Sequence, residues 1–306
     1  MEIQNITPDE LSIKIVQGQK FYLIDTLPED HFQEVRLPGS RNACVYQVNF
    51  LSQIRRITED QDAEIVVYGS SSSSLDSQVA AEKLQRAGYR RIAILRGGIE
   101  KWREAGQLLE GSAPDGVGDP LTVLHLEPGT FTLDVRQSIV GWTGRNRNSS
   151  HIGTVPFSSG WIAVTEGGFS GSLTVDMARL ENHSLAGDPL QEVLVDHLKS
   201  DDFFLVALFP EATLTISVAR LRGKPYLTGV NCDIAGELSL RGVSRSLSFP
   251  ATVTTTSEGI SVEAHFDLDR TEWGIIYGSA RYFEHLGMHQ VFEAITISLR
   301  LVLARA

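Results

Sequence analysis

Residues 64–84 read EIVVYGSSSSSLDSQVAAEKL, and this stretch decides how the first third of the chain folds. Glu64 to Tyr68 is a short run rich in β-branched residues, which is typical of a buried strand. Five serines, Ser70 to Ser74, then interrupt the apolar pattern, and a helical pattern runs on to Leu84. A loop between a strand and a helix points backbone N–H groups and the positive end of the helix dipole at whatever it encloses. The stretch therefore predicts a strand, an anion-accepting loop and a helix.

Similar strand and turn signals surround this stretch in a fixed order. They are Phe21–Asp25, a buried strand; Leu37–Asn42, a Pro-Gly turn; Ala87–Ile92; and Leu95–Trp102, which carries the Gly97-Gly98 pair. Together these segments resemble the rhodanese-like family of sulfur carriers. The resemblance implies an α/β domain over residues 1–112, with a parallel sheet flanked by helices.

The serine loop stands where the resemblance implies a catalytic cysteine directly after the strand. Sulfane-sulfur chemistry needs a thiolate, and a serine hydroxyl is a poor nucleophile without a base beside it. Here Gly69, Ser70, Ser71, Ser72, Ser73 and Ser74 fill that loop. We expect an inactive sulfurtransferase domain that serves as a regulatory or partner-binding module, with a loop that either binds an anion or partner or is simply solvated.

An enzymatic alternative stays open for this half of the chain. A sulfurtransferase-type or anion-handling enzyme could use the loop itself or Cys44, the cysteine of this half. Cys44 follows the Pro-Gly turn rather than the strand, which favours a structural, buried thiol.

The region after Gly106 is rich in turn-forming residues, and residues 113–120 are predicted to be a linker. The whole chain of 306 residues carries a net charge of −11, which argues against a nucleic-acid-binding face. Its two cysteines do not indicate a disulfide framework. The acidic start and the lack of a long apolar run predict a cytoplasmic protein without a membrane span.

Beyond the linker the hydrophobic period changes to two. Apolar and polar residues alternate in Gly171–Met177, Thr213–Val218, Val262–Leu268 and Ala294–Leu303. Such strands, with a single expected helix at Leu190–Leu198, predict an antiparallel barrel or sandwich over residues 121–306.

Several segments of this half resemble the YceI-like family of lipocalin-like, polyisoprenoid-binding proteins. The matching segments are Thr130–Asp134, Ser138–Trp142, His197–Phe204, Phe209–Thr213, Gly236–Arg245 and Leu268–Ile275. The resemblance implies a closed antiparallel β-barrel that holds an isoprenoid or quinone-like lipid, with no other cofactor. The function expected on this basis is non-catalytic binding of a long apolar ligand.

Candidate ligand-binding residues are the inward apolar and aromatic positions of the barrel together with one histidine: Trp142, His151, Leu173, Val175, Phe203, Phe204, Leu214, Ile216, Phe266 and Trp273. Each buried CH₂ group is worth about 0.8 kcal/mol, so an isoprenoid tail can bind without a polar anchor. A barrel packed solid by its own side chains is the alternative. His151, beside Arg145, is predicted to contact a polar headgroup.

Other polar residues of this half are predicted to be structural. The histidines do not show a metal-ligand spacing. Asp201 and Asp202 are adjacent, so they are expected to diverge rather than act as an acid–base pair. Arg270 and Glu272 would share one face of a strand and form a local ion pair.

Overall fold

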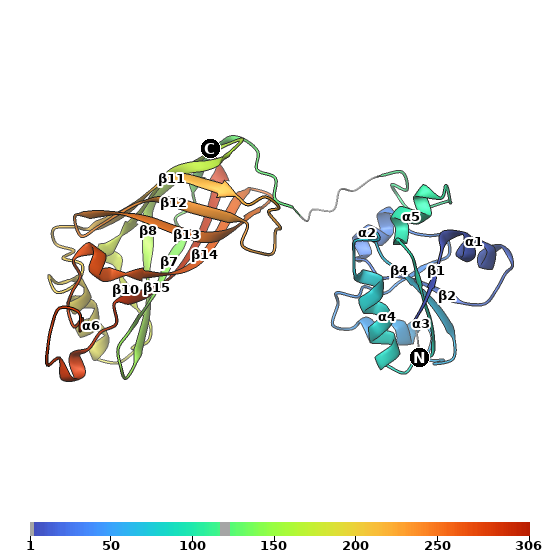
Figure 1. The fold of residues 1–306 in the computed structure, drawn as a ribbon, viewed down its shortest axis with the longest axis horizontal. Coiled ribbons are helices and arrows are strands. Elements are labelled where there is room, and N and C mark those ends of the chain that lie inside the picture. The colour runs from blue at the N-terminus through green and yellow to red at the C-terminus, as the bar shows by residue number, and fades with distance from the viewer. Residues whose placement is uncertain (1–2, 117–122) are drawn as a thin grey trace. The chain divides into compact units, whose positions relative to one another are not determined.

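The computed structural model describes residues 3–116 and 123–306. The chain forms two compact units, residues 1–119 and 120–306 (Figure 1). The predicted linker, residues 113–120, is described only up to residue 116, and the predicted first residues of the barrel domain, 121 and 122, also lie outside the described residues.

The described part of the first unit has a parallel sheet in the order β1-β5-β4-β2-β3. Its strands are β1 (Gln4–Ile6), β2 (Tyr22–Asp25), β3 (Arg41–Asn42), β4 (Glu64–Tyr68) and β5 (Arg91–Leu95). The connecting helices are α1 (Pro8–Val16), α2 (Glu29–Glu34), α3 (Phe50–Ile57), α4 (Asp76–Arg86) and α5 (Gly98–Glu104). Residues from α3 and α4 pack with one set of strand side chains, and residues from α1 and α5 with the other. The predicted α/β fold with a parallel sheet is confirmed.

The second unit is a closed antiparallel barrel. Its strands are β6 (Gly129–Leu133), β7 (Ile139–Arg145), β8 (Ser150–Thr165), β9 (Gly168–Asp176), β11 (Glu211–Leu221), β12 (Cys232–Leu240), β13 (Val243–Thr255), β14 (Gly259–Asp269) and β15 (Ala294–Arg305). Both β6 and β7 pair with β8 and β15, so they share one position of the ring. Pairing of β8 with β9 closes the ring, which has eight positions among the described strands. The barrel prediction is confirmed.

Shorter elements gather at one end of the barrel, where Figure 1 shows α6. They are α6 (Leu190–Lys199), the strand β10 (Glu181–Asn182) and the 3₁₀ turns η1 (Met177–Arg179), η2 (Arg270–Trp273) and η3 (Gly287–His289). Side chains from α6, η1 and η2 form one apolar cluster with barrel residues such as Leu240 and Leu268. A second cluster fills the rest of the barrel, from Phe249 and Leu299 onward to Val253 and Leu303.

Arg270 corrects the sequence interpretation of this region. β14 ends at Asp269, whose carboxylate accepts hydrogen bonds from the N–H and hydroxyl of Thr271, so Arg270 and Glu272 lie in a 3₁₀ turn. The predicted strand and its Arg270–Glu272 pair are therefore wrong. The Arg270 guanidinium is instead buried, and it donates to four backbone carbonyl oxygens: Phe292 at 3.1 Å, Ile275 at 2.5 Å, Tyr277 at 2.7 Å and Val291 at 3.0 Å.

We predict that Arg270→Met destabilises the chain by at least about 3 kcal/mol. A carbonyl left buried without a donor costs about 1–3 kcal/mol, and this change leaves several. Denaturant unfolding of the full chain measures the loss. Arg300→Met is the matched control, because Arg300 is an exposed arginine that pairs with Glu263, and an exposed pair contributes about 1 kcal/mol or less. Equal losses in the two variants would contradict this role of Arg270.

Candidate ligand-binding site

A cavity of about 380 Å³ lies inside the barrel, next to the end that carries α6. Its walls are the inward-facing residues of successive strands, because side chains alternate between the two faces of a strand. Val140 and Trp142 of β7, Val155 and Phe157 of β8, and Leu173 of β9 line it at this two-residue spacing. The lining is almost wholly apolar, which is typical of sites for hydrophobic small molecules.

Eight of the ten predicted barrel residues line this cavity: Trp142, His151, Leu173, Val175, Phe203, Phe204, Leu214 and Phe266. Ile216 and Trp273 do not, which corrects the prediction for these two. Ile216 lies one inward position beyond Leu214 on β11, in the part of the barrel that is packed solid. Trp273 belongs to η2 and is buried in the core, where its indole N–H donates to the Leu238 carbonyl at 2.9 Å.

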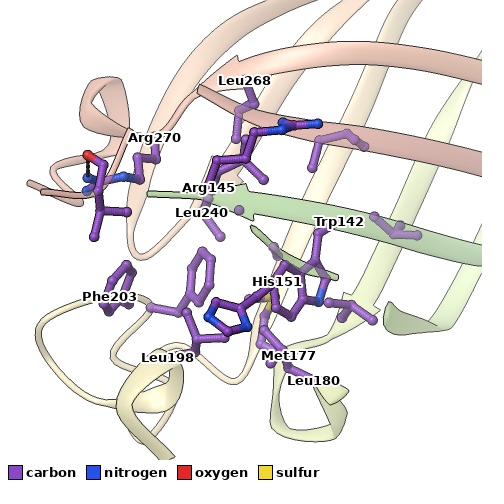
Figure 2. Close-up of a pocket in the computed structure, with 18 of the residues that line it drawn as sticks. Trp142, Arg145, His151, Met177, Leu180, Leu198, Phe203, Leu240, Leu268 and Arg270 are labelled. Atoms are coloured by element: carbon purple, nitrogen blue, oxygen red, sulfur yellow. Dashed lines mark hydrogen bonds between the residues drawn. The ribbon is translucent and has the colours of Figure 1, made fainter. Parts of the chain in front are cut away.

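Residues from the irregular end of the barrel complete the lining. Figure 2 shows Leu198 and Phe203 near His151, with Met177 and Leu180 beside them. The sequence interpretation missed Leu198 and Leu180, which belong to a helix and to the end of a turn without a period-two signal, and it missed Met177, although this residue ends the alternating run Gly171–Met177. His197, Phe203 and Tyr277 form an aromatic cluster, with ring centroids 5.1 Å and 4.8 Å from His197.

The two acidic residues after α6 diverge as predicted. The Asp202 carboxylate accepts a hydrogen bond from the His197 Nε2–H at 3.0 Å, whereas the Asp201 backbone carbonyl accepts from Arg241 at 2.5 Å. The pair of carboxylates does not converge on the cavity. Its role is to fix the loop that carries Phe203 and Phe204.

Trp142 brings a polar group into this apolar lining. Its partner across the β7–β8 ladder is Gly153, where a Cβ atom would lie 2.5 Å from the indole ring, so only glycine leaves room for it. The Trp142 Nε1 atom is buried and has no hydrogen-bond partner among the described residues. A buried N–H without an acceptor is costly, and the indole ring has to shift before an acceptor oxygen in the cavity can reach this one.

His151 and Arg145 both line the cavity, but their polar groups have different partners. His151 faces the cavity and its Nδ1 lies 3.2 Å from the Ser184 hydroxyl. The β7–β8 register pairs His151 with Gly144, and the Arg145 guanidinium donates to the Thr296 hydroxyl at 2.8 Å on the outer face of β15. The Arg145 guanidinium is thus engaged by a hydroxyl of β15, and the headgroup contact through His151 stays a prediction.

The serine loop of the first unit encloses a carboxylate of the chain itself. Asp76, the first residue of α4, accepts hydrogen bonds from the Ser70 N–H at 3.0 Å, the Ser70 hydroxyl at 2.9 Å and the Tyr46 hydroxyl at 2.5 Å. The Ser74 hydroxyl also donates to it. Burial raises the pKa of Asp76, but these hydrogen bonds together hold that pKa below its ordinary value. Two of the loop serines predicted to bind an external anion, Ser70 and Ser74, are thus engaged by an internal one.

The position of the expected catalytic cysteine is shaped for glycine. A Cβ atom at Gly69 would lie 2.7 Å from the Cβ and from a carboxylate oxygen of Asp76, closer than side-chain atoms pack. The Gly69 carbonyl accepts the Ile99 N–H at 3.0 Å, which ties the loop to the start of α5. Cys44 is buried after β3, and its backbone N–H donates to the Gln53 side chain at 2.9 Å.

A second carboxylate, Asp25, lies at the carboxyl end of β2. Burial raises the pKa of Asp25 to about 6, and the negative charge of Asp76 adds to the increase. One of its oxygens accepts the Leu27 N–H at 2.8 Å, and the other is buried without a partner among the described residues. Two carboxylates beside the loop make this region electrostatically unfavourable for a further anion.

Comparisons with protein families agree with both folds. A family model described as a YceI-like domain matches residues 131–303, more than half of the chain. The chain belongs to the YceI-like family. A second model, described as a rhodanese-like domain, matches residues 7–105. This YceI-like protein thus has a rhodanese-like domain before its barrel, as the motifs of both halves predict.

Individual relatives share less than 30% of their aligned residues with this chain. The adenylyltransferase and sulfurtransferase UBA4 of Candida albicans is 28% identical over 103 residues, which are 32% of this chain and 23% of the relative. The chain thus spans about a quarter of that relative's length. BcnA of Burkholderia cenocepacia is 19% identical, with 56% of this chain and 99% of that one covered and a TM-score of 0.45. A polyisoprenoid binding domain from Saccharophagus degradans, implicated in plant cell wall breakdown, is 14% identical, with 59% and 100% covered and a TM-score of 0.42.

The part of the YceI-like protein that the structure describes has neither a membrane-spanning helix nor a candidate metal cluster. Its helices include none that is both long and apolar enough to cross a membrane. Clusters of three or more histidine, cysteine or acidic residues that could hold a metal ion are likewise absent from these residues.

We predict that Asp76→Ala destabilises the rhodanese-like domain by about 1–3 kcal/mol and creates an anion site in the loop. The change leaves the Ser70 N–H and the Tyr46 hydroxyl without their acceptor, which costs about that much. Millimolar sulfate should then raise the unfolding temperature of the variant more than that of the wild-type protein, at ionic strength matched with chloride. Asp62→Ala, a change at an exposed carboxylate that pairs with Arg90, is the control. An equal response to sulfate in all three proteins would refute the role of Asp76.

Proposed function

We propose that the protein binds an amphiphile with an isoprenoid tail, of the quinone or polyprenyl type, inside its C-terminal barrel and does not transform it. The observation that carries this proposal is the mainly apolar cavity of about 380 Å³, open at one end, within a YceI-like barrel. The isoprenoid character of the tail is the expectation drawn from the family resemblance of the sequence. The Saccharophagus domain is described as polyisoprenoid-binding, which is the same ligand class.

The lining accounts for affinity and for orientation separately. Apolar walls such as Leu173, Leu214 and Phe266 favour a hydrocarbon tail, at about 0.8 kcal/mol for each CH₂ group removed from water. The cavity-facing His151 offers a hydrogen bond to the oxygen of a headgroup, and a shift of the indole ring would let the unpaired Trp142 N–H offer a second. An amphiphile with a single polar end therefore fits the distribution of polar groups better than a plain hydrocarbon.

The rhodanese-like domain is proposed to act as a regulatory or partner-binding module without catalysis. Three features support this part of the proposal. Gly69 stands in place of a nucleophile, the loop donors are engaged by Asp76, and Cys44 is buried. A thiolate nucleophile must be accessible to its substrate, and the loop does not supply one. A cytoplasmic location stays a prediction.

We predict that the purified full chain binds a ubiquinone with two isoprene units at one molecule per chain, as measured by native mass spectrometry. Leu214→Trp should weaken this binding by at least about tenfold, because the larger side chain occupies the cavity. Thr215→Trp is the matched control: Thr215 is the next residue of β11, and it is exposed on the outer face. If both variants bind as the wild-type protein does, the ligand is not held in this cavity.

We also predict that the full chain transfers sulfur from thiosulfate to cyanide no faster than buffer, and that Cys44→Ser leaves this rate unchanged. The physical reason is the absence of an accessible thiolate beside the loop in the described structure. A rate well above background that disappears in Cys44→Ser would establish the enzymatic alternative instead.

A further inference from the structure

The cavity ends abruptly part-way along the barrel. On β13 the lining includes Leu247 and Phe249, but the next inward residue, Ala251, belongs to the packed cluster. On β14 the lining includes Leu268 and Phe266, but the next inward residue, Ala264, belongs to the packed cluster as well. The change occurs at the same level on both strands, so the cavity has a floor.

Two stacked aromatic rings form this floor on the β13–β14 side. The rings of Phe249 and Phe266 lie with their centroids 4.3 Å apart and their planes 12° apart. Phe249 is almost fully buried and Phe266 is partly buried, and both contact the cavity. The next inward residues toward the packed part of the barrel are small, Ala251 on β13 and Ala264 on β14. The two rings are therefore the largest side chains at the floor on this pair of strands. A stacked pair of this kind resists displacement because both rings lose contact area if either one moves.

The volume above the floor limits what the cavity can hold. The cavity of about 380 Å³ lies near the lower end of the range of about 300–1,000 Å³ that is typical of small-molecule sites, so it suits a short chain of about ten to fifteen carbons. An isoprene unit contributes five carbons, so the cavity holds about two to three units. A tail longer than this has to leave through the open end, where Met288 is exposed beside His289 and Gln290.

We propose that Phe249 and Phe266 determine the length of tail that the cavity buries, with a limit at about three isoprene units. The inference rests on the proposed function and specifies its ligand class: a short isoprenoid chain, or the first units of a longer one whose remainder stays outside the barrel. Affinity then rises with tail length only while added carbons enter the cavity, and it becomes constant once they stay in water.

The test compares prenyl alcohols that share one headgroup: geraniol, farnesol and geranylgeraniol, with two, three and four isoprene units. Their affinities for the full chain are measured by competition with a bound fluorescent fatty-acid probe. For the wild-type protein we expect an increase of about tenfold or more from geraniol to farnesol and less than about twofold from farnesol to geranylgeraniol. In Phe249→Ala the loss of a six-carbon ring opens room for about one more unit, so the increase should continue to geranylgeraniol.

Phe131→Ala is the matched control, because it removes the same ring from the packed part of the barrel, outside the cavity lining. It should keep the wild-type dependence on tail length. Phe266→Ala gives a second route through the same floor if Phe249→Ala does not fold, since Phe266 is the less buried ring of the pair.

Each outcome separates this inference from the proposed function. A failure of all three alcohols to bind the wild-type protein would overturn the proposed function and this inference with it. Binding that keeps rising about tenfold from farnesol to geranylgeraniol in the wild-type protein would overturn the length limit alone. Unchanged length profiles in the floor variants would overturn the assignment of the limit to Phe249 and Phe266.

Discussion

The end of the barrel depends on one buried cation. Residues 274–293 connect η2 to β15 largely without regular secondary structure, so their carbonyl groups lack the partners that a sheet would give. The Arg270 guanidinium supplies those partners to Ile275, Tyr277, Val291 and Phe292. Three of these residues, Tyr277, Val291 and Phe292, also line the cavity. The position of this wall of the cavity therefore depends on the hydrogen bonds that Arg270 donates to its backbone carbonyl groups.

The sequence predicts which face of a strand points inward, but not how deep an inward residue lies. Leu214 and Ile216 share a face of β11, and the alternation of the sequence treats them alike; only the first lines the cavity. The level of the floor depends on where large rings from neighbouring strands meet, which a single strand does not contain. The sequence pattern places Arg270 on a strand and Trp273 at an inward barrel position, but a 3₁₀ turn follows β14 directly and ends the two-residue period.

The serine loop shows a second limit of sequence reasoning. The sequence predicts the strand, the loop and the helix correctly. What the pattern did not reveal is the acceptor, because Asp76 reads as an ordinary acidic residue in the first turn of a helix. Only the folded chain brings it against Ser70 and Tyr46, which lie on separate segments. The resulting arrangement resembles an anion-bound site in which the anion is covalently part of the protein.

The barrel has a packed part, which forms its hydrophobic core, and a hollow part, which forms the cavity. The packed cluster, which runs from Leu133 and Ile162 to Val253 and Leu303, makes its contacts among side chains of the barrel itself. Its buried area stabilises the barrel independently of the ligand, as the core of any small domain does. For the ligand proposed above, loading and release would then be local events at one end of the barrel, and the packed part of the core would keep its own contacts.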